Sequence, residues 1–398
     1  MSGRDRMAHS KALWVVMPGC LLLAVSCSST RTIVRDFQHY KQRLIEEMAP
    51  DPSVTLLEAQ LRRLQGRWLL QGETTLPAAR QRLVSYTDRL LGEGRYRNQM
   101  ILLPDSELMP DQYGLIRVST AQLRAGPKHS AELVDQAILG QRVRLLKQDG
   151  QWFLVQTDYD YIGWMTQESF VRTDLAGVNA WTRTSQVRVR SNYAVVYSEP
   201  DTRSVPVMDA TLNARLTREN AQDTWTQVTA PDGRQGWIQS DCILPLGTWQ
   251  YPELSRRESI VKTAIQMTGV PYLWGGNSSK ANDCSGFVQT VFKANGIQLP
   301  RDARQQAREG INVDFASEYA ELEPGDLLFF GRPGAITHVA ISLGGPRFIH
   351  QSSDVHVNSL DPADAEFNAS SKETLRFVKR ILSGQNDGSS RAHLKAPP

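Results

Sequence analysis

The chain has 398 residues, which is too long for one hydrophobic core and indicates three or four domains. Its 45 Lys and Arg residues nearly balance its 42 Asp and Glu residues, so the formal net charge is only +3. This charge gives no reason to expect a nucleic-acid partner. The composition is that of an ordinary globular protein.

The beginning of the chain is similar to an export signal. Three basic residues precede an apolar run over residues 12–25, which is too short to span a membrane comfortably. The run ends in the sequence LAVSC, which resembles a bacterial lipobox, whose cysteine is lipidated and becomes the mature N-terminus. We therefore expect residues 1–27 to be a signal peptide, Cys27 to be the lipidation site, and the protein to reside in the cell envelope, on the periplasmic side of a membrane. Cleavage without lipid, or a single transmembrane anchor, are the alternatives.

Residues 31–110 carry apolar patterns at helical spacing. They predict helices over residues 33–48, 53–64 and 77–91, with Pro77 in the first turn of the last helix and Gly92 after its end. No residue pattern with chemical meaning stands out in this stretch. We expect a small helical region that packs against the domains after it.

The next stretch contains an internal repeat. A tryptophan in a short apolar run is followed twelve residues later by a Gly-Trp pair, once at Trp152 and again at Trp225. Short alternating strands precede each copy, so each predicts a small barrel, and both copies resemble bacterial SH3-like domains, at residues 112–173 and 184–246. The two tryptophans could form a ligand-binding surface, but we expect them in the cores.

Residues 245–257 contain Pro and Gly breakers and predict a linker, and the polar tail 383–398 is expected to be disordered. The chain has four cysteines, of which two lie in the signal segment and only Cys242 and Cys284 lie in the folded part. This pattern shows no disulfide framework, and we interpret Cys242 as a small buried apolar residue.

Cys284 stands at the start of a predicted helix. A turn-rich segment, Pro271 to Gly276, precedes it, and apolar residues from Phe287 to Phe292 follow at helical spacing. The first turn of a helix presents unpaired N–H groups and a partial positive charge, which favour a thiolate. Cys284 is therefore a candidate nucleophile, although a buried structural cysteine is the commoner case.

Two histidines follow on a predicted hairpin. Residues 336–343 are rich in β-branched side chains, and Gly344 to Pro346 then turn the chain toward His350. If these three residues form the loop, His350 pairs opposite Ala340 and shares the sheet face of His338; a two-residue loop would place the histidines on opposite faces. We expect the shared face.

The predicted site thus combines a thiol, an imidazole that accepts its proton, and a second polar group that fixes the first ring. We take Cys284, His338 and His350 for these parts, with His356 as a rival for the third. The same histidines with Asp354 could instead bind zinc, but the chain lacks the H-E-x-x-H spacing, so we expect neither a metal nor a cofactor.

Six motifs in order, WGG, DCSGF, PRD, PGDLLFF, HV and FIH, resemble those of the NlpC family of cell-wall peptidases, over residues 255–382. The resemblance implies a papain-like catalytic domain. The expected fold class is multidomain α+β, in which two small SH3-like β-barrels and a short helical N-terminal region precede that domain.

The whole arrangement resembles γ-D-glutamyl-L-diamino acid endopeptidases. The resemblance implies that the protein hydrolyses murein peptides with a free N-terminal L-Ala through a thioester intermediate. We expect it to act as a monomer. Asp283 and Asp302, together with Glu132 and Tyr161 of the first barrel, would hold the substrate amine. Three further residues would contact substrate or shape the cleft: Ser285, Tyr272 and Trp274. The alternatives are a non-catalytic wall-binding scaffold, and an amidase or acyltransferase using the same thiol.

Overall fold

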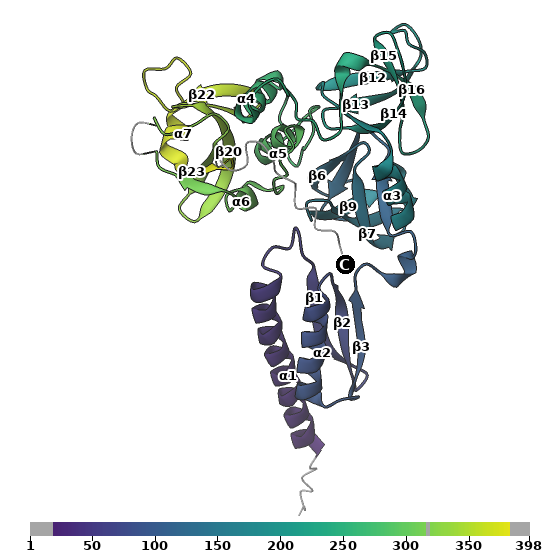
Figure 1. The fold of residues 1–398 in the computed structure, drawn as a ribbon. Helices are drawn as coiled ribbons and strands as arrows, with labels where there is room; N and C mark the ends of the chain where they lie inside the picture. Colours follow the sequence, from purple (N-terminus) through teal and green to yellow (C-terminus); the bar gives the residue numbers. More distant parts are fainter. Residues whose placement is uncertain (1–18, 316–318, 383–398) are drawn as a thin grey trace, which may run out of the picture. The chain divides into compact units, whose positions relative to one another are not determined.

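The computed structural model describes residues 19–315 and 319–382, which form two compact units, one ending at Leu103 and the other starting at Pro104 (Figure 1). The predictions for the basic start of the signal segment and for the tail 383–398 fall outside the described residues. The backbone of Cys27 lies in α1 (Gly19–Met48). No helix among the described residues is long and apolar enough to cross a membrane.

The first unit is a three-stranded sheet with helices α1 and α2 (Pro77–Leu91) packed on one face (Figure 1). The strand order is β1-β2-β3, with β1 (Leu57–Leu64) antiparallel to β2 (Arg67–Thr74) and β3 (Tyr96–Leu102) parallel to it. The helix expected over 77–91 is confirmed, and the one expected over 33–48 is confirmed with an earlier start, at Gly19. The helix expected over residues 53–64 is wrong, because this segment forms strand β1.

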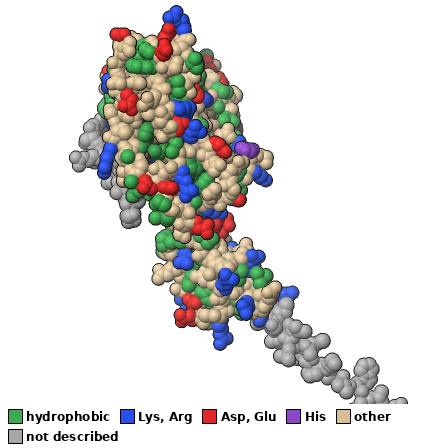
Figure 2. Space-filling view, turned by 90° about the vertical axis from the view of Figure 1, so that its right-hand side faces the viewer, with side chains coloured by type: hydrophobic (Ala, Val, Ile, Leu, Met, Phe, Trp, Pro, Cys, Tyr) green, Lys and Arg blue, Asp and Glu red, His purple; other side chains and the backbone are tan. Residues whose placement is uncertain are grey.

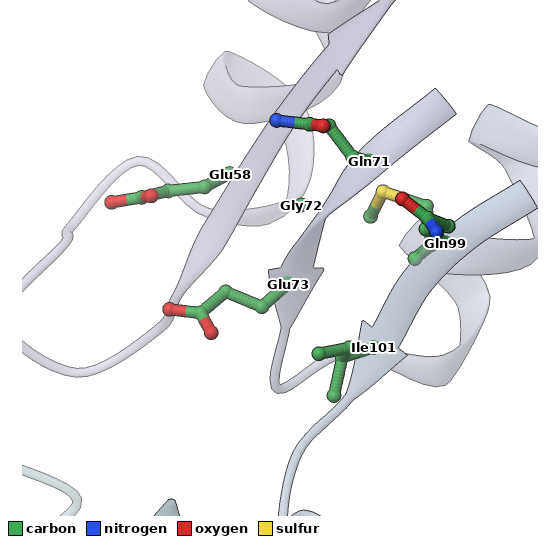
Figure 3. Close-up of a pocket in the computed structure, with 7 residues that line it drawn as sticks. Glu58, Gln71, Gly72, Glu73, Gln99 and Ile101 are labelled. Atoms are coloured by element: carbon green, nitrogen blue, oxygen red, sulfur yellow. The ribbon is translucent and has the colours of Figure 1, made fainter. Parts of the chain in front are cut away.

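The other face of this sheet carries a shallow pocket of about 540 Å³ (Figure 3). Glu58 and Glu73 line it as directly opposite partners on β1 and β2, and Gln71 and Gln99 lie beside them. None of the candidate catalytic residues belongs to this unit.

The second unit begins with two barrels of the same topology. In the first, the strand order is β10-β4-β7-β8-β9-β5-β6, and in the second β17-β11-β14-β15-β16-β12-β13, so each strand occupies the place of its counterpart seven positions later. The sequence repeat is therefore a repeat of fold. The first barrel comprises β4 (Tyr113–Ile116), β5 (Thr120–Arg124), β6 (Leu133–Ile138), β7 (Arg142–Asp149), β8 (Trp152–Thr157), β9 (Ile162–Thr166) and β10 (Phe170–Thr173), with short 3₁₀ turns η1 (Ser106–Leu108) and η2 (Gln167–Ser169).

Helix α3 (Leu175–Arg183) connects the barrels. The second comprises β11 (Gln186–Val189), β12 (Tyr193–Tyr197), β13 (Pro206–Thr211), β14 (Arg215–Gln222), β15 (Trp225–Thr229), β16 (Gln235–Gln239), the 3₁₀ turn η3 (Ser240–Cys242) and β17 (Ile243–Pro245). Trp152 is buried as expected, whereas Trp225 is only partly buried and packs edge-on against Tyr197. Cys242 is partly buried and packs against the second core.

The stretch after β17 is packed rather than loose. Gln250 is almost fully buried, where its amide accepts a hydrogen bond from Arg188 and donates one to Gln266 of the catalytic domain. The predicted linker therefore joins the second barrel to the catalytic domain through side-chain contacts.

The catalytic domain packs helices against a six-stranded sheet of order β18-β23-β19-β20-β21-β22, whose neighbours all pair antiparallel. Helix α5 (Cys284–Ala294) is buried along nearly its whole length against β20 (Ala335–Gly344). The remaining elements are α4 (Arg256–Gln266), α6 (Ala303–Gln306), β18 (Ile311–Val313), β19 (Leu327–Arg332), β21 (Arg347–Gln351), β22 (Val355–Ser359), α7 (Ala369–Thr374) and β23 (Leu375–Arg380). The predicted fold class is confirmed, with the exception that the N-terminal region also contains a sheet.

On the face of the molecule drawn in Figure 2, basic and acidic side chains are interspersed, in keeping with the small net charge.

Candidate active site

Cys284 is the first residue of α5, as its sequence context predicts. Asp283 caps the helix, since its Oδ1 accepts a hydrogen bond from the Gly286 N–H at 2.8 Å. Cys284 as a whole residue is only 8% exposed. A nucleophile is thus held at the helix start, where the backbone N–H groups lack intrahelical partners.

The loop before Cys284 approaches the helix so closely that one position requires glycine. A Cβ on Gly286 would lie 2.1 Å from the carbonyl oxygen of Gly276. From the other side, Phe287, Val291 and their neighbours anchor the helix in the domain core. Each fully buried side chain of this kind contributes about 1.5–3 kcal/mol, so the position of the thiol is fixed by packing.

Burial decides the protonation of the reacting pair. Burial, with the nearby Asp283 carboxylate, raises the pKa of Cys284 to about 12, although the N–H groups of Val339 and Ser285 and the charge of Arg301 act in the opposite direction. Burial also lowers the pKa of His338 to about 4. Both shifts favour a neutral thiol and a neutral imidazole in the free enzyme over the ion pair that a helix start alone would favour.

The hairpin places His338 and His350 on one face, as predicted, but by a different route. Gly344 pairs with Arg347, so the loop is the two residues Gly345 and Pro346 and not three. A β-bulge between Ser342 and Gly344 shifts the register by one residue. The bulge offsets the shorter loop, so the prediction of a shared face is confirmed and the predicted loop length is wrong.

The three histidines are hydrogen-bonded in series. His338 Nε2 lies 2.8 Å from His350 Nδ1, and His350 Nε2 lies 3.2 Å from His356 Nε2. Burial and the neighbouring imidazoles lower the pKa of His350 to about 3, so it is neutral at physiological pH. Because these nitrogens bond to one another, they do not converge on a common point, and no group of three His, Cys, Asp or Glu among the described residues is arranged to hold a metal ion.

The other predicted residues gather where the first barrel meets the catalytic domain. Trp274, which is 64% exposed, donates its indole N–H to Glu132 at 2.6 Å, across the two domains. The buried hydroxyl of Tyr161 is hydrogen-bonded to the carboxylate of Asp302. Burial, and then the negative charge of Asp302, raise the pKa of Tyr161. Tyr272 lies near the thiol: burial and then Cys284 raise its pKa to about 12.

Asp283 and Ser285 are already engaged inside the protein. Both Asp283 oxygens accept bonds from Arg301, at 3.0 and 2.6 Å, and Ser285 Oγ accepts another from the same guanidinium. The Gly275 N–H donates to Asp283 as well. These contacts hold Asp283 and Ser285 at the start of the helix, and their predicted contact with the substrate stays a prediction.

Two residues of this network carried no predicted role. Arg301, which is 1% exposed, donates its Nε–H to Asp135 of β6 at 2.7 Å. Asp135 is fully buried and also accepts bonds from Tyr159 at 2.6 Å and from Asn277 at 3.0 Å. The sequence does hold a signal for it, because Asp135 and Gln136 are polar residues in the middle of an apolar strand.

Two protein-family models match parts of this chain. The model of the NlpC/P60 family matches residues 269–375, which include Cys284, His338 and His350, and the model of the bacterial dipeptidyl-peptidase Sh3 domain matches residues 123–170. Dipeptidyl-peptidase 6 of Lysinibacillus sphaericus is 33% identical over 250 residues, which cover 61% of this chain and 89% of that protein.

A second relative, gamma-D-glutamyl-L-lysine dipeptidyl-peptidase of Bacillus subtilis, is 28% identical over 267 residues, which cover 62% of this chain and 84% of that protein. Among solved structures, an NlpC/P60 family protein from Bacillus cereus superposes with a TM-score of 0.58 at 24% identity, over 68% of this chain and 100% of that one. This likeness shows a shared fold.

Proposed function

Because the chain belongs to the NlpC/P60 family of cysteine peptidases, we propose that it hydrolyses the bond between γ-D-glutamate and a diamino acid in murein peptides that carry a free N-terminal L-alanine. The observation that carries the proposal is the placement of Cys284 at a helix start, facing a strand whose His338 is hydrogen-bonded to His350. The names of two relatives, dipeptidyl-peptidase 6 and gamma-D-glutamyl-L-lysine dipeptidyl-peptidase, support the proposal that this bond is the one cleaved.

In the first half of the reaction, His338 takes the proton of the Cys284 thiol as the sulfur attacks the γ-glutamyl carbonyl carbon. The negative charge that forms on the carbonyl oxygen is stabilised by backbone N–H groups at the start of α5, including that of Cys284. His338 then gives its proton to the amine of the diamino acid, which leaves, and a thioester remains on Cys284.

In the second half, His338 takes a proton from a water molecule that attacks the thioester. The thiolate leaves and regains its proton from the same ring. His350 holds that ring by the 2.8 Å hydrogen bond in both halves. No metal ion takes part in any of these steps.

The groups that would bind the substrate amine are Glu132, Tyr161, Asp283 and Asp302. An ammonium leaving water needs carboxylates or other oxygen acceptors close by, or its desolvation is not offset. Glu132 comes from the first barrel, and Trp274 donates to only one of its two carboxylate oxygens, so the carboxylate retains acceptor sites for the amine. A first barrel that closes one end of the cleft would account for a preference for short peptides.

The test uses residues 31–398 with L-Ala-γ-D-Glu-diaminopimelate and with its N-acetylated form, and identifies products by mass spectrometry. We expect release of L-Ala-D-Glu from the free peptide only. Cys284→Ala should abolish it, while Cys242→Ala, a cysteine in the second barrel, serves as the matched control and should leave it intact. EDTA should have no effect.

The outcomes separate the alternatives. Equal cleavage of both peptides would retain the peptidase and refute the amine site. No cleavage of either would favour a wall-binding scaffold or an acyl bond of another kind. Full activity of the Cys284→Ala variant, together with loss of activity in EDTA, would indicate that a metal ion and not the thiol is needed for the reaction.

Export and lipidation are proposed from the sequence alone. Cys27 follows an apolar segment with the lipobox-like sequence LAVSC. In cells grown with a palmitate analogue, we expect the full chain to become labelled and the Cys27→Ala variant to remain unlabelled. An unlabelled, cleaved wild-type chain would indicate ordinary signal cleavage.

A further inference from the structure

His338 can accept the thiol proton only through a ring nitrogen that carries none. Its Nε2 is engaged with His350 Nδ1 at 2.8 Å, so Nδ1 is the nitrogen left for Cys284. Between the two rings lies one proton. If it sits on His338 Nε2, Nδ1 is free to act as a base; if it sits on His350 Nδ1, the neutral His338 carries its proton on Nδ1 and cannot act. This question arises within the proposed function and goes beyond it.

A series of hydrogen bonds that starts at a backbone N–H group determines which of the two rings carries this proton. The Ser371 N–H can only donate, and it donates to Asn368 Oδ1 at 2.9 Å. The amide nitrogen of Asn368 must then be its other end, and it donates to Asn358 Oδ1 at 3.1 Å. Asn358 Oδ1 therefore accepts, and its amide nitrogen points to the Glu366 carbonyl. His350 Nε2, 3.1 Å from that same oxygen, has to be the donor.

A second series of hydrogen bonds starts at a backbone carbonyl group and also ends at His350 Nε2. The carbonyl oxygen of Asp354 can only accept, and His356 Nδ1 lies 3.0 Å from it and 3.1 Å from the carboxylate of the same residue. His356 therefore carries its proton on Nδ1. Its Nε2 is bare in the neutral ring and faces His350 Nε2 at 3.2 Å as a second acceptor.

We infer that Asn358 and His356 are positioning residues that fix the tautomers of the catalytic histidine pair. Both require a proton on His350 Nε2. His350 Nδ1 is then bare and accepts from His338 Nε2, which leaves His338 Nδ1 bare toward the thiol. When the thiol proton arrives at Nδ1, the His338 imidazolium donates from both nitrogens, and no other proton has to move.

The placement of these residues on the sheet explains why they act together. His350 pairs with His356, and Phe348 pairs with Asn358, so both anchors lie on β22 and flank His350 on one face. Asn368 is the cap residue of α7, which ties the orientation of the Asn358 amide to the main chain. The strand that carries no reacting group thus determines the proton positions of the strands that do.

The first test reads the tautomers directly. The full chain with ¹⁵N-labelled histidine is examined by long-range ¹H–¹⁵N NMR at neutral pH, and His338→Gln and His350→Gln variants assign the signals. We expect a bare Nδ1 and a protonated Nε2 on both rings. Protonation of His338 at Nδ1 would overturn the inference. Since this readout needs no substrate, it stands or fails independently of the proposed peptidase activity.

The second test removes the two positioning residues, Asn358 and His356. Asn358→Leu together with His356→Leu should lower kcat about tenfold with KM unchanged, because the two lost hydrogen bonds no longer favour the tautomer of His338 that can accept the thiol proton. In the same spectra a signal for Nδ1–H should appear on His338. Each single substitution should cost less, since the other acceptor remains. Asn358→Asp in the His356→Leu background restores an acceptor and should recover most of kcat.

Asn312→Leu, the same exchange on exposed strand β18, is the control and should change neither readout. Unchanged tautomers and an unchanged kcat in the double variant would overturn the inference that Asn358 and His356 fix the tautomers. Loss of kcat with unchanged tautomers would overturn it too, because it would show that the substitutions act on packing alone.

Discussion

At the scale of single residues, the reacting pair is held far from its ordinary protonation behaviour. The pKa of the Cys284 thiol is raised to about 12 and that of His338 is lowered to about 4, in both cases chiefly by burial. Proton transfer between them is therefore unfavourable in the empty site.

The low pKa of His338 predicts activity in acid. The ring must be neutral to accept the thiol proton, and it stays neutral as pH falls through 6.5 because its pKa is near 4. We expect the acidic limb of kcat/KM to lie close to pH 4. A limb at 6.5 would show that His338 titrates as an ordinary exposed histidine.

The same shifts predict the pH dependence of stability. His338 and His350 bind protons in the unfolded chain near pH 6.5 but in the folded protein only near 4 and 3. Between these values the unfolded state carries more protons, so stability falls as pH falls. Melting curves between pH 7 and pH 4 measure this, and His350→Gln should flatten the dependence. They also serve as the control for the activity profile.

The sequence revealed the reacting residues because each stands in a local pattern: a cysteine before a helical repeat and two histidines around a turn. It did not reveal Asp135 or the place of Arg301, because these two residues are 166 positions apart in the chain. It did not reveal Asn358 either, whose partners 8 and 10 positions away reach it only through the pairing of β21 with β22 and the cap of α7. Glu132 and Trp274 were predicted separately, but their mutual hydrogen bond was not.

At the scale of elements, the segment Leu57–Leu64 shows why one prediction was wrong. Its apolar residues fit a helical period, but Leu57, Ala59 and Leu61 also alternate, and these three are the buried ones. Gln65 and Gly66 both have positive φ, as in a tight two-residue hairpin turn. Pairing with β2 therefore prevailed over the local helical pattern.

Helix α5 provides the test at this scale. Gly286→Ala would place a Cβ 2.1 Å from the Gly276 carbonyl oxygen, so the helix or the loop must move. We expect a loss of about 1–3 kcal/mol in stability and a fall in kcat of at least tenfold, measured by urea unfolding and peptide hydrolysis. Gly126→Ala, where the added Cβ meets its nearest neighbour at 3.8 Å, should change neither.

At the scale of the whole molecule, the first barrel supports the start of the helix that carries Cys284. Arg301 lies between Asp135 of the barrel and Asp283 at the start of α5, and all three are largely buried. Such a triad tolerates loss of a member poorly, because a charge is then buried without its partner.

Asp135→Ala should therefore destabilise the second unit by about 3–5 kcal/mol and reduce hydrolysis. Residues 255–382 alone, which lack the barrel, should be unstable and inactive. Asp201→Ala, which breaks an exposed pair with Arg203, is the control and should leave the melting temperature unchanged. An active, stable fragment 255–382 would contradict this account.

The buried guanidinium of Arg301 also has a consequence for how such proteins can evolve. A gene rearrangement that joined this catalytic domain to a foreign barrel would leave Arg301 without its second carboxylate, at a site water does not reach. Recombination would be productive only if β6 travelled with the domain or if a replacement acid arose at the same point. The two domains should therefore be inherited as a pair, while the second barrel, which supplies no charge to this triad, is freer to diverge.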